Sequence, residues 1–297
     1  MIFINSNECT FLRKFGDGTQ QIRFPKDFNR HNLGPDLAFT WLYDNEEELL
    51  TLYYLVSYYR MTDYMFDNPV YTLKVPYLPN ARMDRVQEYF NDNEKSNPSE
   101  VFTLKFFANF INSLKFDQVI TYDVHSEVAK SLINNIIDWS PERQIKKSME
   151  DIKARNLSNN LTICFPDFGA YKRYAKLLIF RECDVVYGMK TRDWHSREIK
   201  SLNIVSDESG TRIENLKNCN VLIIDDIIST GGTISRVVKE LLNKGAKSIY
   251  CYCSHLENSA FKGTEFGDLV HDKKIEKVYT TDSIFRKKND AVKILEV

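Results

Sequence analysis

The sequence has no long apolar run, no recognisable signal peptide and no zinc-binding arrangement of its few cysteines. No stretch is long and apolar enough to span a bilayer, and the N-terminal MIFINSNECT has neither a basic region nor a long apolar run. The six cysteines are scattered, mostly in apolar strand-like contexts, so neither a metal site nor a disulfide framework is expected from them. These features predict a cytoplasmic protein with reduced core thiols.

An excess of charge of one sign is also missing. The formal net charge is -1, which gives no reason to expect nucleic acid or an anionic membrane as the main partner. There is no low-complexity segment and no short-period repeat. The length of 297 residues and a hydrophobic content of 43% favour a globular protein of about two domains.

The most informative segment is Val221 to Thr233, which reads VLIIDDIISTGGT. Its branched apolar residues predict a strand that is buried on both faces. A helix is expected next, since five apolar residues fall at the three-and-four spacing of one face: Ile234, Val237, Val238, Leu241 and Leu242. Gly245 stands where a C-terminal cap glycine would, and Ser248 to Cys253 reads as the next strand. A strand–loop–helix–strand unit of this kind favours a parallel sheet.

The turn between this strand and helix predicts a phosphate site. A Gly-rich turn presents backbone N–H groups at a helix N-terminus, where they bind a phosphate monoester. Asp225 and Asp226 precede the turn and could accept hydrogen bonds from ribose hydroxyls or hold a divalent cation. An ordinary strand–helix turn is the structural alternative. The segment is not a nucleoside-triphosphate P-loop, since no Lys follows the glycines, and not a dinucleotide fingerprint, since the glycines are adjacent.

The two halves of the chain look alike in plan. In the first half we expect strands at 71–77 and 118–122, a polar loop at 91–99, and a helix from about residue 100. One face of that helix would carry Leu104, Phe107, Ile111 and Leu114. In the second half we expect strands at 161–165 and 184–187, with a helix over about 171–180 between them. The polar segment 138–160 is expected to be part helix and part connector.

The segment from Val221 to Thr233 resembles the phosphoribosyl-pyrophosphate loop of type I phosphoribosyltransferases and of ribose-phosphate diphosphokinases. The chain length and the pair Lys190 and Arg192 favour the diphosphokinases. This resemblance implies an α/β fold of two tandem type I phosphoribosyltransferase-like domains, each with a mainly parallel sheet flanked by helices. Residues 1–145 would form the ATP side, and residues 146–297 would carry the ribose-phosphate loop.

Further segments resemble the diphosphokinase family in the same order and at similar spacing. Phe15-Gly16-Asp17-Gly18 resembles its adenine-side segment, and VPYLPNARMDR (75–85) resembles its Pro-Tyr…Ala-Arg-Gln-Asp-Arg segment. The resemblance assigns ATP binding to Phe15, Asp17, Arg82 and Asp84.

The remaining roles also follow from the resemblance. Tyr122-Asp123-Val124-His125 resembles a metal-binding Asp-Leu-His segment, and PDFGAYKR (166–173) resembles Pro-Asp-x-Gly-x-x-Lys-Arg, so His125 and Asp167 would be on the Mg²⁺ side. Lys190-Thr191-Arg192 resembles the mobile catalytic loop, whose Lys and Arg stabilise the transition state. Asp225 and Asp226 would bind the ribose. The 5-phosphate would be bound by Ser229, Thr230, Gly231, Gly232 and Thr233.

Each assignment has a structural alternative. His125 could be an ordinary structural histidine, Asp167 could cap or shape its turn, and Lys190, Arg192 and Arg82 could be solvated surface charges. The expectation that all of them lie at strand ends, on the same sheet edge as Asp225, favours a shared site.

The implied reaction is transfer of the β,γ-diphosphate of ATP to the anomeric hydroxyl of ribose 5-phosphate, with AMP as the leaving group. Mg²⁺ on the phosphates, together with Lys190 and Arg192, would offset the repulsion between anionic substrate and nucleophile. No general base is obvious, so positioning and electrostatics would drive the reaction. Members of the family work as dimers or larger, which implies a homo-oligomer.

The sequence departs from the family at several positions. Thr19 and Met83 replace a usual Glu and Gln on the nucleotide side, and Ser229 replaces a common Asp. The regulatory Lys-Ser-Arg-Ala-Pro segment is absent, with QEYFNDNEKSNPSE (87–100) in its place, so allosteric control of the usual kind is not expected. Two alternatives stay open. One is the same chemistry on ADP-ribose, as in phage enzymes that rebuild NAD⁺ in the host cytoplasm, and the other is a catalytically silent regulatory homologue.

Overall fold

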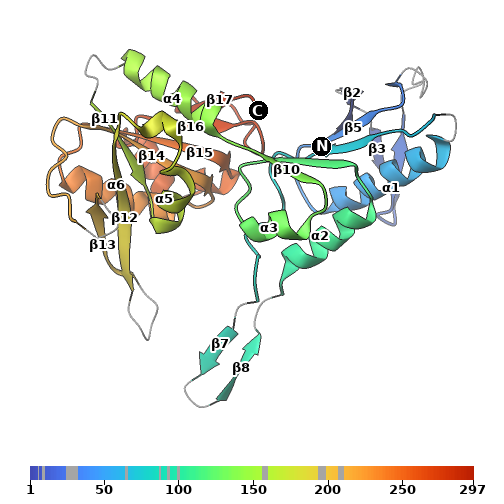
Figure 1. The fold of residues 1–297 in the computed structure, drawn as a ribbon, viewed down its shortest axis with the longest axis horizontal. Coiled ribbons are helices and arrows are strands. Elements are labelled where there is room, and N and C mark those ends of the chain that lie inside the picture. Colours follow the sequence, from blue (N-terminus) through green and yellow to red (C-terminus); the bar gives the residue numbers. More distant parts are fainter. Residues whose placement is uncertain are drawn as a thin grey trace. The chain divides into compact units, whose positions relative to one another are not determined.

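The chain forms two compact units, Met1–Trp139 and Ser140–Val297 (Figure 1). The computed structural model describes residues 1–5, 7–8, 11–24, 33–63, 66–86, 88–91, 94–98, 101–155, 160–192, 199–206 and 211–297. The sequence placed the division between residues 145 and 146, whereas the two units part between 139 and 140. The assignment of one part to ATP and the other to the ribose phosphate stays a prediction.

The first unit is built on a sheet with strand order β10-β9-β6-β5-β1-β2. The parallel strands are β5 (Leu37–Trp41), β6 (Tyr71–Lys74), β9 (Gln118–Tyr122) and β10 (Ile136–Trp139), and the antiparallel edge is β1 (Ile2–Ile4) with β2 (Asn7–Glu8). The helices are α1 (Glu47–Thr62), α2 (Thr103–Ser113) and α3 (Glu127–Leu132). The predicted face of α2 is confirmed, because Leu104, Phe107 and Ile111 are buried.

Two hairpins form separate two-stranded sheets. One joins β3 (Phe11–Lys14) to β4 (Gln20–Arg23), and the other joins β7 (Glu88–Asn91) to β8 (Glu94–Pro98). The prediction of a polar loop over 91–99 is therefore wrong in part. The strands of such a separate hairpin need not bury one face in the core of the main sheet, so their hydropathy gives little signal for a strand.

The second unit has the strand order β13-β12-β11-β14-β15-β16-β17. These strands are β11 (Leu161–Phe165), β12 (Asp184–Arg192), β13 (Ile199–Val205), β14 (Asn220–Ile228), β15 (Ser248–Leu256), β16 (Lys277–Thr281) and β17 (Val292–Leu295). The helical segments are α4 (Glu142–Arg155), α5 (Phe168–Tyr174), η3 (Leu178–Phe180), α6 (Gly232–Asn243), η4 (Asn258–Phe261) and α7 (Glu265–His271). Neighbouring strands run parallel apart from β12 and β13 among the described pairs, so the predicted fold class is confirmed.

The central strand β14 is buried on both faces, as its composition predicts. Ile223 packs with Val237 and Val238 of α6, whereas Leu222 and Ile224 pack in the opposite layer that holds α4. Because successive residues of a strand point to opposite faces, this alternation fixes β14 between two helical layers. The loop that follows Ile228 therefore starts from a rigid support.

The helix expected over about 171–180 is shorter and starts earlier. Helix α5 begins at Phe168 and ends at Tyr174, and η3 is a separate turn. Asp167 caps the helix, which moves its start to the residue directly after the Pro-Asp pair. Within the described residues, none of the helices combines the length and the apolar character that crossing a membrane requires.

Asp151 of α4 ties this helix to the sheet of its own unit. Tyr279 Oη and Arg155 Nε donate to Asp151 Oδ2 at 2.7 and 2.8 Å, and Lys293 Nζ donates to Oδ1 at 2.7 Å. Partial burial raises the pKa of Asp151, but the hydrogen bonds from Lys293, Tyr279 and Arg155 together outweigh this and hold the pKa well below its usual range.

We expect Asp151→Asn to lower the free energy of unfolding by about 1–3 kcal/mol at pH 7, the usual effect of losing charged hydrogen bonds. Because the folded pKa is depressed, this stabilisation is complete above the unfolded pKa of about 3.9 and is lost as the pH falls toward the folded value. Urea unfolding should therefore show a difference between wild type and variant that shrinks below about pH 4. Asp272→Asn, which changes an exposed acid of the same unit, is the control and should stay within about 0.5 kcal/mol of wild type. A variant as stable as wild type at pH 7 would contradict this account of Asp151.

Candidate functional site

The predicted phosphate loop lies between β14 and α6, at the carboxyl end of the central strand of the second unit. The strand ends at Ile228, Gly231 is the N-cap residue, and α6 begins at Gly232. The cap residue has no side chain that could accept hydrogen bonds from the first turn of the helix. Such a helix N-terminus offers N–H donors to an anionic ligand.

Two features make glycine necessary at position 231. Its φ of 75° lies in the left-handed region, and a Cβ there would be 2.4 Å from Cβ of Phe266 in α7. Gly232 differs, because a Cβ at that position would meet no atom within 4 Å. The path of the loop is thus set by Gly231 and Phe266.

The acid pair lies inside β14, just before the loop. Asp226 is buried, and its backbone N–H donates to Asp225 Oδ1 at 3.0 Å. Burial raises the pKa of Asp225, and the charges of Asp226 and Asp167 raise it further. Arg173 Nη1 of α5 lies 3.9 Å from Asp226 Oδ2. Acids crowded in this way favour ligands that donate hydrogen bonds, such as sugar hydroxyls, or that carry positive charge.

Asp167 has the capping role that the sequence left open as its alternative. Its Oδ1 accepts hydrogen bonds from the N–H groups of Gly169 and Ala170, at 3.0 and 3.1 Å, at the start of α5. The strand before it, β11, lies between β12 and β14, so Asp167 stands between the ends of those strands. Its effect on the pKa of Asp225 agrees with this position.

Lys190 and Arg192 do not lie in a loop, which corrects the prediction. They belong to the last part of β12, where Lys190 pairs with Leu202 of β13 and Arg192 pairs with Ile199, with an irregularity between Thr191 and Arg192. These residues are in a strand because they pair with β13, and the local sequence gives no sign of that partner. Gly188 brings β12 close to β11, since a Cβ there would be 2.6 Å from the Pro166 carbonyl oxygen. Lys190 is thus two residues beyond Gly188, where β12 comes close to the Pro166-Asp167 turn.

In the first unit the structure joins Asp84 to the turn that holds His125. Ser126 Oγ donates to Asp84 Oδ2 at 2.7 Å and also caps α3 by accepting from Val128 N–H. His125 is exposed, and Asp123, two residues before it, is buried with a φ of 47°. A non-glycine residue in the left-handed region stores about 1–2 kcal/mol of strain, and such residues are common at functional sites. Arg82 is exposed on the turn that follows β6.

Phe15 and Asp17 lie in the turn of the β3–β4 hairpin. Asp17 Oδ1 accepts from the N–H and the Oγ1 of Thr19, at 2.9 and 2.7 Å, and these hydrogen bonds lower the pKa of Asp17. Thr19, where the family usually has Glu, therefore shapes this turn.

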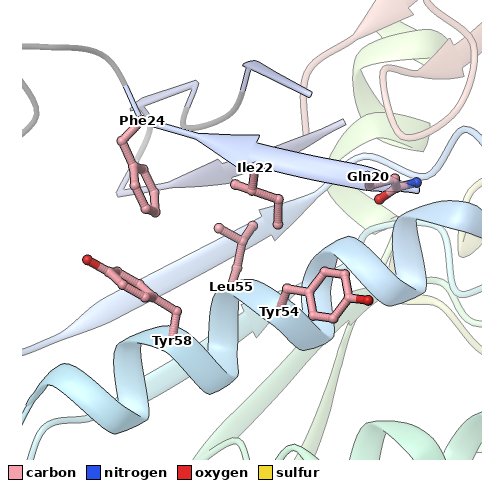
Figure 2. A pocket seen from close by; sticks show the side chains of 6 residues that line it. All are labelled: Gln20, Ile22, Phe24, Tyr54, Leu55 and Tyr58. Atoms are coloured by element: carbon pink, nitrogen blue, oxygen red, sulfur yellow. The ribbon is translucent and has the colours of Figure 1, made fainter. Parts of the chain in front are cut away.

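The same hairpin covers a pocket of about 430 Å³ against α1. Ile22 and Phe24 face Leu55 and Tyr58 across it (Figure 2), and the rings of Phe24 and Tyr58 are 5.4 Å apart. The described residues that line this pocket include none of the predicted site residues.

The predicted residues therefore form two groups, one in each unit. The first holds Phe15, Asp17, Arg82, Asp84 and His125; the second holds Asp167, Lys190, Arg192, Asp225, Asp226 and Ser229 to Thr233. Among the described residues, no three His, Cys, Asp or Glu side chains are arranged so that they could hold a metal by themselves.

Sequence reasoning missed two residues near the loop. Arg173 ends the quoted segment PDFGAYKR, so its place in that motif could have identified it. Glu257 has no motif signal. It follows β15, and its Oε2 accepts from Ser229 Oγ at 2.7 Å and from Ser259 Oγ at 3.0 Å.

Comparisons with known proteins agree on one family. A family model for the phosphoribosyl transferase domain matches residues 159–284. Ribose-phosphate pyrophosphokinase of Ureaplasma parvum is 28% identical over 230 residues, 75% of this chain and 62% of the relative. That of Campylobacter jejuni is 29% identical over 229 residues, 76% of this chain and 65% of the relative. The chain thus spans less than two thirds of the length of these two relatives. The enzyme of the same name from Methanobrevibacter smithii is 27% identical over 258 residues, 85% of this chain and 79% of the relative.

A solved structure shows the same fold. Phosphoribosylpyrophosphate synthetase from Mycobacterium smegmatis superposes with a TM-score of 0.67 over 98% of this chain and 87% of that chain, at 15% identity. The likeness in fold therefore extends over nearly the whole of this chain.

Proposed function

This chain belongs to the ribose-phosphate pyrophosphokinase family, and from that premise we propose that it transfers the β,γ-diphosphate of ATP to the anomeric hydroxyl of ribose 5-phosphate, releasing AMP. The main support is the acid pair of β14 followed directly by the Gly231 loop. At one strand end, this arrangement offers carboxylates that accept hydrogen bonds from sugar hydroxyls and N–H groups that donate to a phosphate.

The acceptor half of the site would use residues from Asp225 to Thr233. The loop N–H groups and the hydroxyls of Thr230 and Thr233 would bind the 5-phosphate, and Asp225 and Asp226 would accept hydrogen bonds from the ribose hydroxyls. Arg173, 3.9 Å from Asp226, would hold that carboxylate in place. Since the acceptor is fixed at both ends, its anomeric hydroxyl would be presented in one orientation.

Mg²⁺ fits the second unit chemically. Asp167 lies near Asp225 and Asp226 on neighbouring strand ends, and the charges of the other two acids raise the pKa of Asp225, so added positive charge would stabilise the group. Mg²⁺ is commonly held by one or two carboxylates together with substrate phosphates. We propose that Asp167 and His125 are on the metal side. The bound ion would neutralise phosphate charge on ATP.

Lys190 and Arg192 would stabilise the charge that develops on the transferred group. Phe15, Asp17, Arg82 and Asp84 would bind ATP from the first unit. The cytoplasmic location and the homo-oligomeric state, dimer or larger, that the resemblance implies are part of the same proposal.

ADP-ribose is a second candidate acceptor. It presents the same anomeric hydroxyl, but its 5-phosphate is half of a diphosphate that joins it to adenosine, so the loop would bind a substituted phosphate in place of a free monoester. The observation that favours it is the hydrogen bond that Ser229 Oγ donates to the carboxylate of Glu257. While this bond is made, the loop has one hydroxyl donor fewer for a free phosphomonoester.

Mass spectrometry of the products tests the proposal. The protein is incubated with ATP·Mg²⁺ and, side by side, with ribose 5-phosphate, with ADP-ribose or with no acceptor. We expect AMP release that depends on an acceptor, with a product heavier than that acceptor by one diphosphate. AMP release no higher than in the acceptor-free sample for both sugars would contradict the proposed enzyme and favour a catalytically silent homologue.

A further inference from the structure

The pocket between the β3–β4 hairpin and α1 has no part in the proposed reaction. Its volume of about 430 Å³ is within the usual range of small-molecule sites, about 300–1,000 Å³. The described residues that line it are Gln20, Ile22 and Phe24 on the hairpin side, and Tyr54, Leu55 and Tyr58 of α1 (Figure 2). They alternate along the hairpin strand and recur at helical spacing in α1, so each wall of the pocket is a single face of its element.

The two walls face each other without filling the space between them. Ile22 and Phe24 pack against the core of the first unit but are only partly buried. Tyr54 and Tyr58 are 43% and 40% exposed. Protein interiors are packed closely and have few voids larger than a water molecule, so a gap of this size is not ordinary core packing. A ligand in the gap would remove apolar surface of all four side chains from water, which favours binding.

The two ends of the pocket differ in chemistry (Figure 2). At one end, the rings of Phe24 and Tyr58 are in contact, with their centroids 5.4 Å apart, so a ligand ring cannot lie between them. At the other end, buried Thr51 donates from Oγ1 to Gln20 Oε1 at 2.9 Å. This bond fixes the amide and leaves Gln20 Nε2, which carries two hydrogens, as the donor for a ligand.

The lining also excludes charged ligands. Among the described residues that line the pocket, none is Asp, Glu, Lys, Arg or His. A phosphate buried here would lose its hydration without gaining a cationic partner, which is strongly unfavourable. Nucleotides and sugar phosphates therefore do not suit this pocket, and its ligand differs in class from the substrates of the proposed reaction.

We propose that this pocket binds an uncharged planar aromatic molecule that carries a hydrogen-bond acceptor, either a ring nitrogen or a carbonyl oxygen. The ring of the ligand packs between Ile22 and Leu55 and against the half-exposed ring of Tyr54. Its acceptor takes a hydrogen bond from Gln20 Nε2. The inference does not depend on the proposed function, because it uses only the lining of the pocket.

Quinoline is the probe, since it is planar, uncharged at neutral pH, and has one ring nitrogen that accepts a hydrogen bond. It is titrated into the full chain and followed by saturation-transfer-difference NMR, which measures weak binding without turnover. We expect saturable binding with a Kd of about 1 mM or lower, which is usual for a ligand of about ten non-hydrogen atoms.

Two variants place the ligand in the pocket. Gln20→Leu removes the donor, and Tyr54→Ala removes the ring of the wall. Each should weaken quinoline binding about fivefold or more, the effect of losing one hydrogen bond or one aromatic contact. The matched control is Tyr53→Ala, the neighbouring tyrosine of α1. Tyr53 is 44% exposed, lies 6.3 Å from the ring of Phe110 in α2, and should leave the Kd unchanged.

The outcomes decide the inference either way. Saturable binding that weakens in both variants and not in the control supports it. Wild type that shows no saturable binding of quinoline up to about 10 mM overturns it, and so does an unchanged Kd in Gln20→Leu or in Tyr54→Ala. An equal loss in Tyr53→Ala would place the ligand on the outer surface of α1 and also overturn it. Because AMP release is not measured, failure here is separate from failure of the proposed function.

Discussion

Replacing Lys190 with alanine is expected to lower kcat for acceptor-dependent AMP release by about a thousandfold, with a smaller effect on KM for either substrate. A cationic donor aimed at developing phosphate charge acts mainly in the transition state, and removing such a group typically costs about 10²–10³ in kcat or more. Lys190 suits this role because β12 passes close to the Pro166-Asp167 turn at Gly188, two residues earlier. Steady-state AMP release at saturating substrates checks the prediction.

The matched control is Lys247→Ala. Lys247 is an exposed lysine of the same unit that directly precedes β15, at the amino edge of the sheet and away from the loop. It should keep wild-type turnover. Near-normal kcat in Lys190→Ala would show that the catalytic assignment is wrong, while an equal loss in both variants would point to a general effect of charge.

Replacing Gly231 with alanine is expected to destabilise the protein by about 3 kcal/mol or more. The left-handed backbone costs an L-residue about 1–2 kcal/mol, and the new Cβ would add a steric conflict with Phe266, 2.4 Å away. Because Phe266 is fully buried in the core layer that holds α6 and α7, it has little room to move. Urea unfolding monitored by circular dichroism checks this prediction.

Gly232→Ala is the matched control one residue further on. A Cβ at that position meets nothing within 4 Å, and alanine is the better helix former, so the change should stay within about 1 kcal/mol and could stabilise. If both alanine variants lost the same stability, the special geometry assigned to Gly231 would be wrong. Calorimetric titration with ribose 5-phosphate should in addition show weaker binding by Gly231→Ala, since the N–H groups of the loop would be displaced.

Local pattern was sufficient for the elements that carry the phosphate loop. Strand β14 reads as a buried run and is buried, and α6 places Ile234, Val237, Val238 and Leu241 in the core as their spacing predicts. Strands β9 and β11 have the predicted bounds, and Gly245 has the positive φ of a helix C-terminus, 83°. These features depend on neighbours in the chain, so periodicity and cap chemistry reveal them.

Other features depend on residues far apart in the chain. The strand at Lys190 and Arg192 requires pairing with β13, and no property of residues 190–192 announces that partner. The Pro-Asp turn was recognised as a motif, but the effect of Asp167 on the pKa of Asp225 depends on β11 lying beside β14.

The sequence by itself therefore determined the chemistry of the loop: two acids, hydroxyls and adjacent glycines between a buried strand and a helix. The tertiary structure alone decided which groups surround that loop. Phe266 comes 35 positions after Gly231 in the chain, yet it restricts the backbone of the loop. Glu257 comes 28 positions after Ser229, yet it accepts a hydrogen bond from the Ser229 hydroxyl. The physical reason is that parallel strands are joined through helices, so residues that are far apart in the chain meet at the same edge of the sheet.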